Sequence, residues 1–450
     1  MDLTLKEKVA DLDRELLREH RYDTALFSEL IEIQRASGIL HGSRPISPFL
    51  RPYFLEASRY AAIKRAARAI SSAFEALTDA VLESPELMRR IGLTEAEERF
   101  ARFDPGYRTV SVTSRLDTFL DAGGFKFLEY NAETPAGVGD QHELEAMITR
   151  VPGVRDFLAI HPHYFPQPHI RLLQALDAAY REYGGEKEKP NIAIVDWAGV
   201  DTSPEFEVLR AHFESCAYPS RIFDPSELEF DGEVLRSGEF EVDIFYKRIV
   251  IHEFLERCDE THAIAQAVAH GAVCMANSFR SKIPHKKSGF AILSDQKYHR
   301  LFTSGQIAVI QKHIPWTRLV EDAQTSFRSG DADLLKLLRT DRYRFVMKPV
   351  DDYGGKGIVF GWEASGSEWD DAIEHALEVP YVAQERAGVE KVDIPVFTDG
   401  EARIETLTVD FDPFLFMGEV EGGMVRLAPG SLVNITQGGG EAALAILEGF

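Results

Sequence analysis

The chain lacks the features that mark secreted and membrane-spanning proteins. It has only three cysteines in 450 residues, Cys216, Cys258 and Cys274, with no CxxC spacing. A disulfide framework is therefore not expected, and the composition suits a reducing compartment. No run reaches the roughly eighteen apolar residues of a membrane span, and the charged amino-terminal segment lacks the apolar centre of a signal peptide. We expect a cytoplasmic protein.

Positive charge is also scarce. The 50 Lys and Arg residues face 73 Asp and Glu residues, giving a formal charge of -23. Nucleic acids and acidic membranes attract clustered positive charge, so neither is an expected partner. A cationic small molecule would be favoured, although surplus acid commonly serves solubility alone. The length predicts roughly two to four packed units.

Three common nucleotide-binding motifs are missing. The chain has no GxxxxGK[ST] loop, no kinase-type HRD and DFG set, and no GxGxxG after its strand at 191–195. P-loop NTPases, protein kinases and dinucleotide-binding Rossmann proteins are therefore not indicated.

One charged pattern stands out against these absences. Arg115-Leu-Asp117 is followed, twelve residues after the aspartate, by Glu129-Tyr-Asn131. Residues two apart in a strand share a face, and the intervening Gly123-Gly124 favours a hairpin. The hairpin would bring two carboxylates, an amide and a guanidinium to one face. Those groups suit Mg²⁺ and phosphate, whereas an isolated pair of this kind usually marks only a charged surface face.

A second group of residues lies later in the chain. Phe345-Val-Met-Lys348 predicts an apolar strand that ends in lysine, and Gly354-Gly355-Lys356 follows closely. Glycines let backbone N–H groups approach phosphate, and lysine adds mobile positive charge. Such a segment can also simply turn the chain. Tyr381–Glu385 predicts another strand.

These segments together resemble the synthetase domain of glutathionylspermidine synthase and the type 2 circularly permuted ATP-grasp proteins. The similarity covers roughly residues 100–450. It includes E-x-N-A-E-T-P from Glu129, the Asp243–Arg248 run, Lys286-Lys287, Lys348-Pro, Gln384-Glu385, and Gly422 through Gly440. The metal-ligand motif precedes the lysine and the glycine-rich loop, the reverse of the ordinary ATP-grasp order.

The resemblance implies ATP and one or two Mg²⁺ ions as cofactors. It implies Asp117, Glu129 and Asn131 as metal ligands, and Arg115 as the catalytic group that grips the γ-phosphoryl. Its implied nucleotide-binding residues are Lys287 (or the adjacent Lys286), Lys348, Gly354, Gly355, Lys356, Gln384, Glu385 and Arg426, with Asn434 in the same segment as Arg426. Gln384 and Glu385 would meet the adenine and ribose at an interdomain hinge.

The expected fold is α/β (α+β), a circularly permuted ATP-grasp with a Rossmann-like pre-ATP-grasp unit. Helices expected at 3–20, 23–37, 54–83 and 85–92 give a helical layer. Strands alternating with helices predict a parallel sheet. The expected regions are 1–100 (helical layer), 101–185 (metal ligands), 186–275 (Rossmann-like unit) and 276–450 (nucleotide-binding part with the glycine-rich lid). Lys247 and Arg248 end a strand there, either to bind an anion or as an exposed basic pair.

The resemblance implies an ATP-dependent carboxylate–amine ligase that acts through an acyl phosphate. Small-molecule carboxylate and amine substrates, peptide-like or cationic, would be its partners. A phosphotransferase and a non-catalytic ATP-binding protein are the alternatives. Glutathionylspermidine synthesis itself is not expected, because the bifunctional enzymes carry an amidase domain with a catalytic cysteine and this chain has no cysteine before Cys216.

Overall fold

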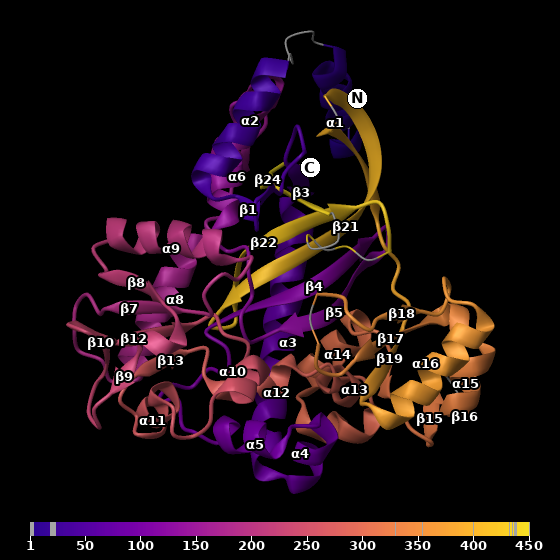
Figure 1. Cartoon of the computed structure of the whole chain (residues 1–450). Coiled ribbons are helices and arrows are strands. Elements are labelled where there is room, and N and C mark those ends of the chain that lie inside the picture. The colour runs from indigo at the N-terminus through magenta and orange to yellow at the C-terminus, as the bar shows by residue number, and fades with distance from the viewer. Residues whose placement is uncertain are drawn as a thin grey trace.

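A six-stranded antiparallel sheet crosses the middle of the molecule (Figure 1). The computed structural model describes residues 4–18, 24–328, 330–352, 354–398, 400–431, 433, 435 and 439–449. The sheet order is β23-β22-β21-β4-β5, with β20 paired to β21. Its strands are β4 (Thr113–Asp121), β5 (Gly124–Asn131), β20 (Lys391–Thr398), β21 (Glu401–Phe416), β22 (Glu419–Ala428) and β23 (Gly440–Ala442). Segments that precede residues 192–276 in the sequence therefore pair in one sheet with segments that follow them.

Helix α3 (Ala57–Glu83) packs against this sheet. Its buried side chains, including Ile63, Ile70, Phe74 and Leu77, recur at helical spacing and join the largest apolar core. The predicted helix at 54–83 was wrong at its start. Tyr53–Glu56 forms strand β3 instead, because it pairs with the distant β24 (Leu444–Leu447).

A parallel four-stranded sheet forms a separate layer, ordered β13-β12-β7-β8. Its strands are β7 (Ile192–Val195), β8 (Ser220–Phe223), β12 (Ile244–Lys247) and β13 (Cys274–Ala276), and its helices are α8 (Pro168–Glu182), α9 (Ser203–Ser215), α10 (Ile251–Arg257) and α11 (Ala263–Ala269). The run Ile192–Val195 is buried throughout, as expected for a strand covered on both faces. The predicted parallel sheet is confirmed.

A smaller antiparallel sheet, β14-β19-β17-β18, lies on the other side of the central sheet (Figure 1). Its apolar core includes Trp369 and Phe345. Its elements are β14 (Thr317–Leu319), β15 (Gln324–Phe327), β16 (Gly330–Asp333), α15 (Leu334–Thr340), β17 (Phe345–Pro349), β18 (Val359–Phe360), α16 (Gly366–Glu378) and β19 (Tyr381–Glu385), with β15 and β16 paired as a separate ribbon.

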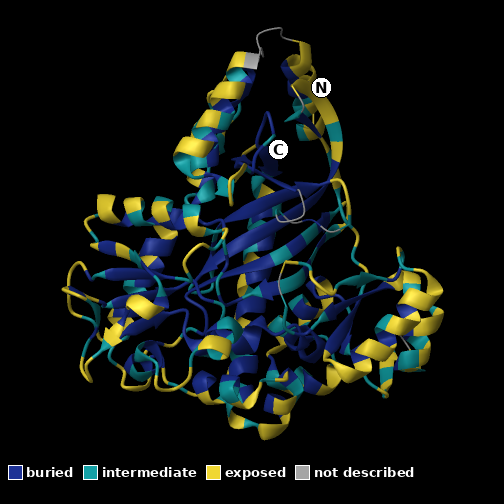
Figure 2. Ribbon diagram, viewed as in Figure 1, coloured by how far each residue is buried: buried dark blue, intermediate teal, exposed yellow. Residues whose placement is uncertain are grey.

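Figure 2 shows buried strands inside the molecule and exposed residues on outer helices such as α2 (Thr24–Ser37) and α9. Strands β3, β24 and β6 (His163–Tyr164) form a three-stranded sheet. The other elements are α1 (Leu5–Arg18), α2 (Thr24–Ser37), β1 (Leu40–His41), β2 (Arg44–Pro45), α4 (Pro85–Ile91), α5 (Glu95–Ala101), α6 (Asp140–Ile148), α7 (Pro152–Ile160), β6 (His163–Tyr164), η1 (Pro225–Glu227), β9 (Glu229–Phe230), β10 (Leu235–Ser237), β11 (Phe240–Glu241), η2 (Phe279–Ser281), α12 (Lys282–His285), α13 (Ser288–Leu293), η3 (Gln296–Leu301), α14 (Ser304–His313) and η4 (Arg342–Arg344). Within the described residues, no helix combines the length and apolarity needed to span a membrane.

Candidate functional site

The predicted hairpin is confirmed as β4 and β5. Arg115 lies opposite Asn131 and Asp117 lies opposite Glu129, so the four side chains share one face of the sheet. An irregularity in register follows Asp117 and was not predicted. The local alternation of the sequence therefore places the four groups as expected.

Asp117 is the most heavily bonded of these groups. It accepts hydrogen bonds from Asn131 Nδ2 at 2.7 Å, Arg426 Nη2 at 2.7 Å and Arg115 Nε at 3.4 Å. Burial would raise the pKa of this carboxyl, but Arg426 and Arg115 lower it to about 2. Asp117 is therefore ionised at neutral pH.

Glu129 lies beside one of the two adjacent lysines. Lys287 Nζ is 3.1 Å from Glu129 Oε1 and donates to the carbonyl of Asp352 at 2.7 Å. Lys286 points elsewhere and pairs with Glu97 at 3.0 Å and Asp351 at 2.6 Å. The structure thus brings Lys287, and not Lys286, to the hairpin.

Lys348 and Gln384 face the hairpin from the smaller sheet. Lys348 Nζ donates to Gln384 Oε1 at 2.9 Å and to the Leu128 carbonyl of β5 at 3.4 Å. Burial lowers the pKa of Lys348. Glu385 Oε1 lies 3.6 Å from Arg328 Nη2. Neighbouring strands β17 and β19 position these groups.

A cavity of about 330 Å³ separates the two sheets. Five of the predicted site residues line it: Asp117, Glu129, Lys348, Gln384 and Glu385. Apolar groups also line it, among them Phe119, Ile358, Phe360 and Trp362. A lining of both charged and aromatic groups suits a ligand with a charged part and a planar part.

Four other predicted residues do not line the cavity but contact residues that do. Arg115, Asn131 and Arg426 contact Asp117, and Lys287 contacts Glu129. Gly354, Gly355 and Lys356 lie outside the cavity lining. Gly354 and Gly355 adopt φ of 69° and 78°, which explains glycine at this turn. Asn434 falls outside the described residues.

Two aspartates of β21 that were not predicted as site residues belong to the same face. Asp410 lies opposite Arg426 in the sheet register, and its Oδ2 is 2.7 Å from Arg426 Nη2. Asp412 Oδ2 is also 2.7 Å from Nη2 and lies 3.7 Å from Arg115 Nε. The available signal was two acids two apart within the apolar run from Leu407 to Phe416.

Glu133, in the same E-x-N-A-E motif, was also missed as an organising residue. It is 1% exposed and lies 2.9 Å from Lys282 Nζ. Its Oε2 accepts the Ile251 N–H at 2.8 Å. The acid therefore connects the hairpin segment to helix α12 and to the start of α10.

Lys247 and Arg248 are both buried, so the exposed-pair interpretation was wrong. Lys247 donates to the Ile249 carbonyl, and burial lowers its pKa to about 8. Arg248 donates to the Pro135 carbonyl at 2.6 Å and to Glu205 at 3.4 Å. Both side chains therefore have hydrogen-bond partners within the protein, although the buried Arg248 Nε has none among the described residues.

The donor set of the hairpin fits magnesium. Asp117, Glu129 and Asn131 offer carboxylate and amide oxygens, which Mg²⁺ prefers over nitrogen or sulfur. Asp410 lines the cavity, and its buried Oδ1 has no hydrogen-bond partner among the described residues. A nearby cation would offset that uncompensated oxygen.

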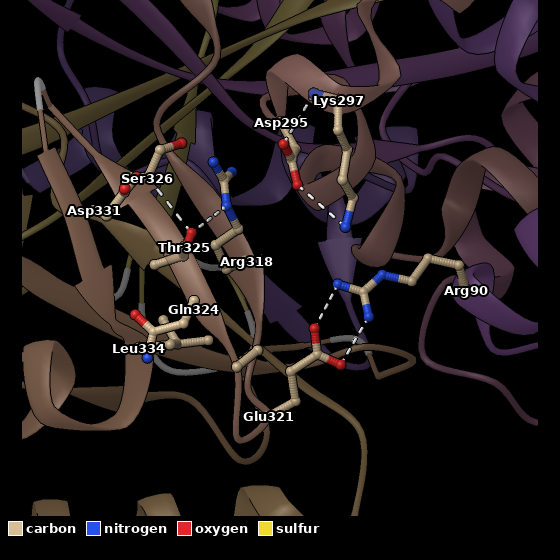
Figure 3. Close-up of a pocket in the computed structure, with 11 residues that line it drawn as sticks. Arg90, Asp295, Lys297, Arg318, Glu321, Gln324, Thr325, Ser326, Asp331 and Leu334 are labelled. Atoms are coloured by element: carbon tan, nitrogen blue, oxygen red, sulfur yellow. Dashed lines mark hydrogen bonds and ion pairs between the residues drawn. The ribbon is translucent and has the colours of Figure 1, made fainter.

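A separate cavity of about 350 Å³ lies between α4, η3 and β14–β16 (Figure 3). Arg90 donates to both carboxylate oxygens of Glu321 at 2.7 Å. Arg318 Nε donates to Thr325 Oγ1 at 2.9 Å. These charged groups find partners inside the protein, and we assign them no ligand.

Comparison with curated proteins finds distant relatives. No family model matches the chain. "Putative glutamate--cysteine ligase 2-3" of Frankia alni is 24% identical over 359 residues, which covers 75% of this chain and 38% of that protein. "Uncharacterized protein ML0605" of Mycobacterium leprae is 24% identical over 432 residues, covering 88% and 71% respectively. The chain thus spans well under half the length of the ligase relative.

Comparison with solved structures shows the fold. The apo structure of a glutathione synthetase-like effector, GSS30, from Globodera pallida superposes with a TM-score of 0.59 at 12% sequence identity. The match covers 96% of this chain and 98% of the effector. The chain therefore has a glutathione synthetase-like mixed α/β fold.

Proposed function

We propose that the chain is an ATP- and Mg²⁺-dependent carboxylate–amine ligase with a circularly permuted ATP-grasp arrangement. One observation carries the proposal: Asp117 and Glu129 of the hairpin face Lys348 and Gln384 across a single cavity of about 330 Å³. The names of the ligase relative and of the structural neighbour support the same class.

The permuted arrangement is supported by sheet pairing. β4, which carries Arg115 and Asp117, pairs with β21 across 280 or more intervening positions. The parallel-sheet unit at 192–276 is inserted between these partners. The four regions at 1–100, 101–185, 186–275 and 276–450 remain our proposed division of the chain.

In this proposal, nucleotide lies in the cavity with its phosphates near the hairpin. Lys348 and Lys287 bind phosphate oxygens, while Gln384 and Glu385 meet the adenine and ribose. Asp117, Glu129 and Asn131 would hold Mg²⁺, which would neutralise charge that develops on the phosphates during transfer. Arg426 and the loop containing Gly354, Gly355 and Lys356 complete the nucleotide site.

The reaction needs activation of a carboxylate. Its oxygen attacks the γ-phosphorus of ATP, giving an acyl phosphate and ADP. The amine then attacks the acyl carbon and displaces phosphate, and the amine loses a proton as the amide forms. Arg115 stabilises the transferring phosphoryl and then the tetrahedral intermediate. An amino acid or short peptide is the proposed acyl donor, and a small amine is the proposed acceptor.

Calorimetric titration with a non-hydrolysable ATP analogue tests the site without knowledge of the substrates. We expect binding of the analogue to require Mg²⁺. Its affinity should fall at least about tenfold, or about 1.4 kcal/mol in binding free energy, in Asp117→Asn and in Glu129→Gln. Asp121→Asn, at the turn of the same hairpin, should bind normally. Undiminished binding in both site variants would reject the metal assignment.

Product analysis then separates the reaction classes. Turnover with pairs of amino acids or amines should release ADP and inorganic phosphate together with an amide. Phosphate retained on the acceptor would indicate a phosphotransferase. Nucleotide binding without turnover across a broad substrate screen would favour a non-catalytic protein.

A further inference from the structure

The guanidinium of Arg426 lies among three aspartates of the central sheet. Its Nη2 is 2.7 Å from Oδ2 of Asp117, Asp410 and Asp412. The carboxylates come from β4 and β21 and the arginine from β22. Their side chains are at most 17% exposed. One protein cation therefore holds three negative groups together.

This cluster is not fully satisfied. Asp410 Oδ1, Asp412 Oδ2 and Arg426 Nε are buried and have no hydrogen-bond partner among the described residues. Most buried polar atoms in proteins have one. Asp412 is fully buried and close to Arg426 Nη2, yet its Oδ2 accepts no hydrogen bond from it. Proximity to Arg426 Nη2 therefore does not give Asp412 Oδ2 the directed hydrogen bond that it lacks.

The charge balance also remains incomplete. Arg115, 3.4 Å from Asp117 and 3.7 Å from Asp412, is the second guanidinium of the cluster. Two positive groups offset two of the three carboxylates. A divalent cation in place of the Arg426 guanidinium would, together with Arg115, offset all three carboxylates. The negative charge that is otherwise left over is costly because the cluster is buried.

The oxygen spacing suits such an ion. One carboxylate oxygen from each of the three aspartates lies within 4.8 Å of the other two. Two ligands of a magnesium ion, each about 2.1 Å away, are separated by about 3 to 4 Å. Small side-chain movements would therefore complete the ligand set. Asp117 and Asp410 also line the cavity, which gives access.

We propose that Asp117, Asp410 and Asp412 form a second divalent-cation site, and that Arg426 holds these carboxylates until an anionic ligand draws its guanidinium away. This rests on the proposed function for the identity of the anion, a polyphosphate. Asp117 is shared with the set containing Glu129 and Asn131.

Replacement of the Arg426 guanidinium by a metal ion couples the binding of metal to the binding of nucleotide. A metal ion cannot enter while the guanidinium occupies the space between the carboxylates, and the guanidinium is released more readily when phosphate receives it. Metal and nucleotide should therefore each bind weakly alone and strengthen one another by the same factor.

Mn²⁺ alone is the first probe, with no nucleotide present. We compare wild type, Arg426→Gln, Arg426→Lys and the double variant Arg426→Gln/Asp412→Asn by electron paramagnetic resonance of free Mn²⁺ and by thermal unfolding. Arg426→Gln should bind Mn²⁺ at least tenfold more tightly than wild type, and Mn²⁺ should raise its melting temperature more. Arg426→Lys keeps a cation and should resemble wild type. In the double variant, Asp412→Asn should remove this gain in Mn²⁺ affinity.

Equal Mn²⁺ affinity in wild type and Arg426→Gln would overturn the proposal, as would a gain that survives Asp412→Asn. If Arg426→Gln does not fold, the single variant Asp412→Asn provides the test because it retains Arg426. With saturating ATP analogue, we expect two Mn²⁺ ions in wild type and one in Asp412→Asn. Two ions in both proteins would also overturn the proposal.

The two proposals fail differently. Absence of ATP-analogue binding by wild type would reject the proposed function. The nucleotide-free Mn²⁺ comparison would still decide whether the three aspartates form a cation site.

Discussion

Two buried clusters each centre on a protein cation that contacts three carboxylates, and a second cation, Lys286 or Arg115, adjoins each, yet their electrostatics differ. Arg426 lies among Asp117, Asp410 and Asp412 at the cavity. Lys282 lies 3.6, 2.9 and 2.7 Å from Glu97, Glu133 and Asp351, respectively, at the start of the glycine-rich segment. The first is called the arginine cluster and the second the lysine cluster.

The pKa values show the difference. Burial would raise the pKa of Glu133, but Lys282, His285 and Lys247 hold it at about 2. In the arginine cluster, burial raises the pKa of Asp410 and raises that of Asp412 well above its ordinary value despite Arg426. By charge, the lysine cluster is therefore compensated and the arginine cluster is not, although each has a buried carboxylate oxygen without a hydrogen-bond partner among the described residues, Glu133 Oε1 and Asp412 Oδ2 respectively. Such perturbed groups in a cavity are more typical of function than of structural support.

Removal of Lys282 should have the largest effect on stability. Lys282→Met leaves Glu133 and Glu97 buried with fewer cations, and we expect a loss of about 3–5 kcal/mol in the free energy of unfolding. Urea denaturation measures it, with exposed Lys297→Met as a control near zero. A loss of less than about 1 kcal/mol would contradict the assigned role of Lys282.

The pH dependence of stability should sharpen the contrast. A pKa of about 2 for Glu133, against its ordinary 4.5, contributes about 3 kcal/mol at neutral pH. Because the folded-state pKa is the lower one, this contribution is present above about pH 4.5 and is lost as pH falls toward 2. Denaturation of Glu133→Gln between pH 7 and 3 should give a flatter profile. Parallel profiles for variant and wild type would contradict the assignment.

Lys348 gives the smallest predicted effect on stability. Among the described residues it has no carboxylate within 4.0 Å, and its Nζ donates only to Gln384 and Leu128 oxygens. Lys348→Met should change unfolding free energy by less than about 1 kcal/mol, while affinity for the Mg²⁺–ATP analogue falls about 10- to 100-fold. Calorimetry compares it with Lys336→Met on the exposed face of α15. Unchanged affinity would remove Lys348 from the nucleotide site.

The sequence predicts those parts of the site that depend on local alternation. Arg115 and Asp117 lie two apart, as do Glu129 and Asn131, and Gly123-Gly124 turns the chain between them. Strand geometry then fixes their common face. The apolar run Ile192–Val195 likewise predicts a strand covered on both sides. Neither inference needs a distant partner.

The parts that the sequence does not reveal depend on distant pairing. Asp410 and Asp412 have the spacing of an ordinary solvent-facing strand, and only the pairing of β21 with β4 and β22 buries them beside Arg426. The choice between Lys286 and Lys287 depends on the junction of two short helices, α12 and α13. Tyr53–Glu56 becomes a strand through β24, almost four hundred positions later.

The pairing of β3 with β24 has a consequence for synthesis on the ribosome. The apolar strand Tyr53–Glu56 emerges early, but its parallel partner Leu444–Leu447 emerges only after nearly all the intervening chain has been translated. At about 5–20 residues per second, that delay lasts some tens of seconds. Throughout it, the backbone groups of β3 that later pair with β24 lack their partner. This edge of the nascent protein should therefore depend on chaperone protection more than the locally closing β4–β5 hairpin does.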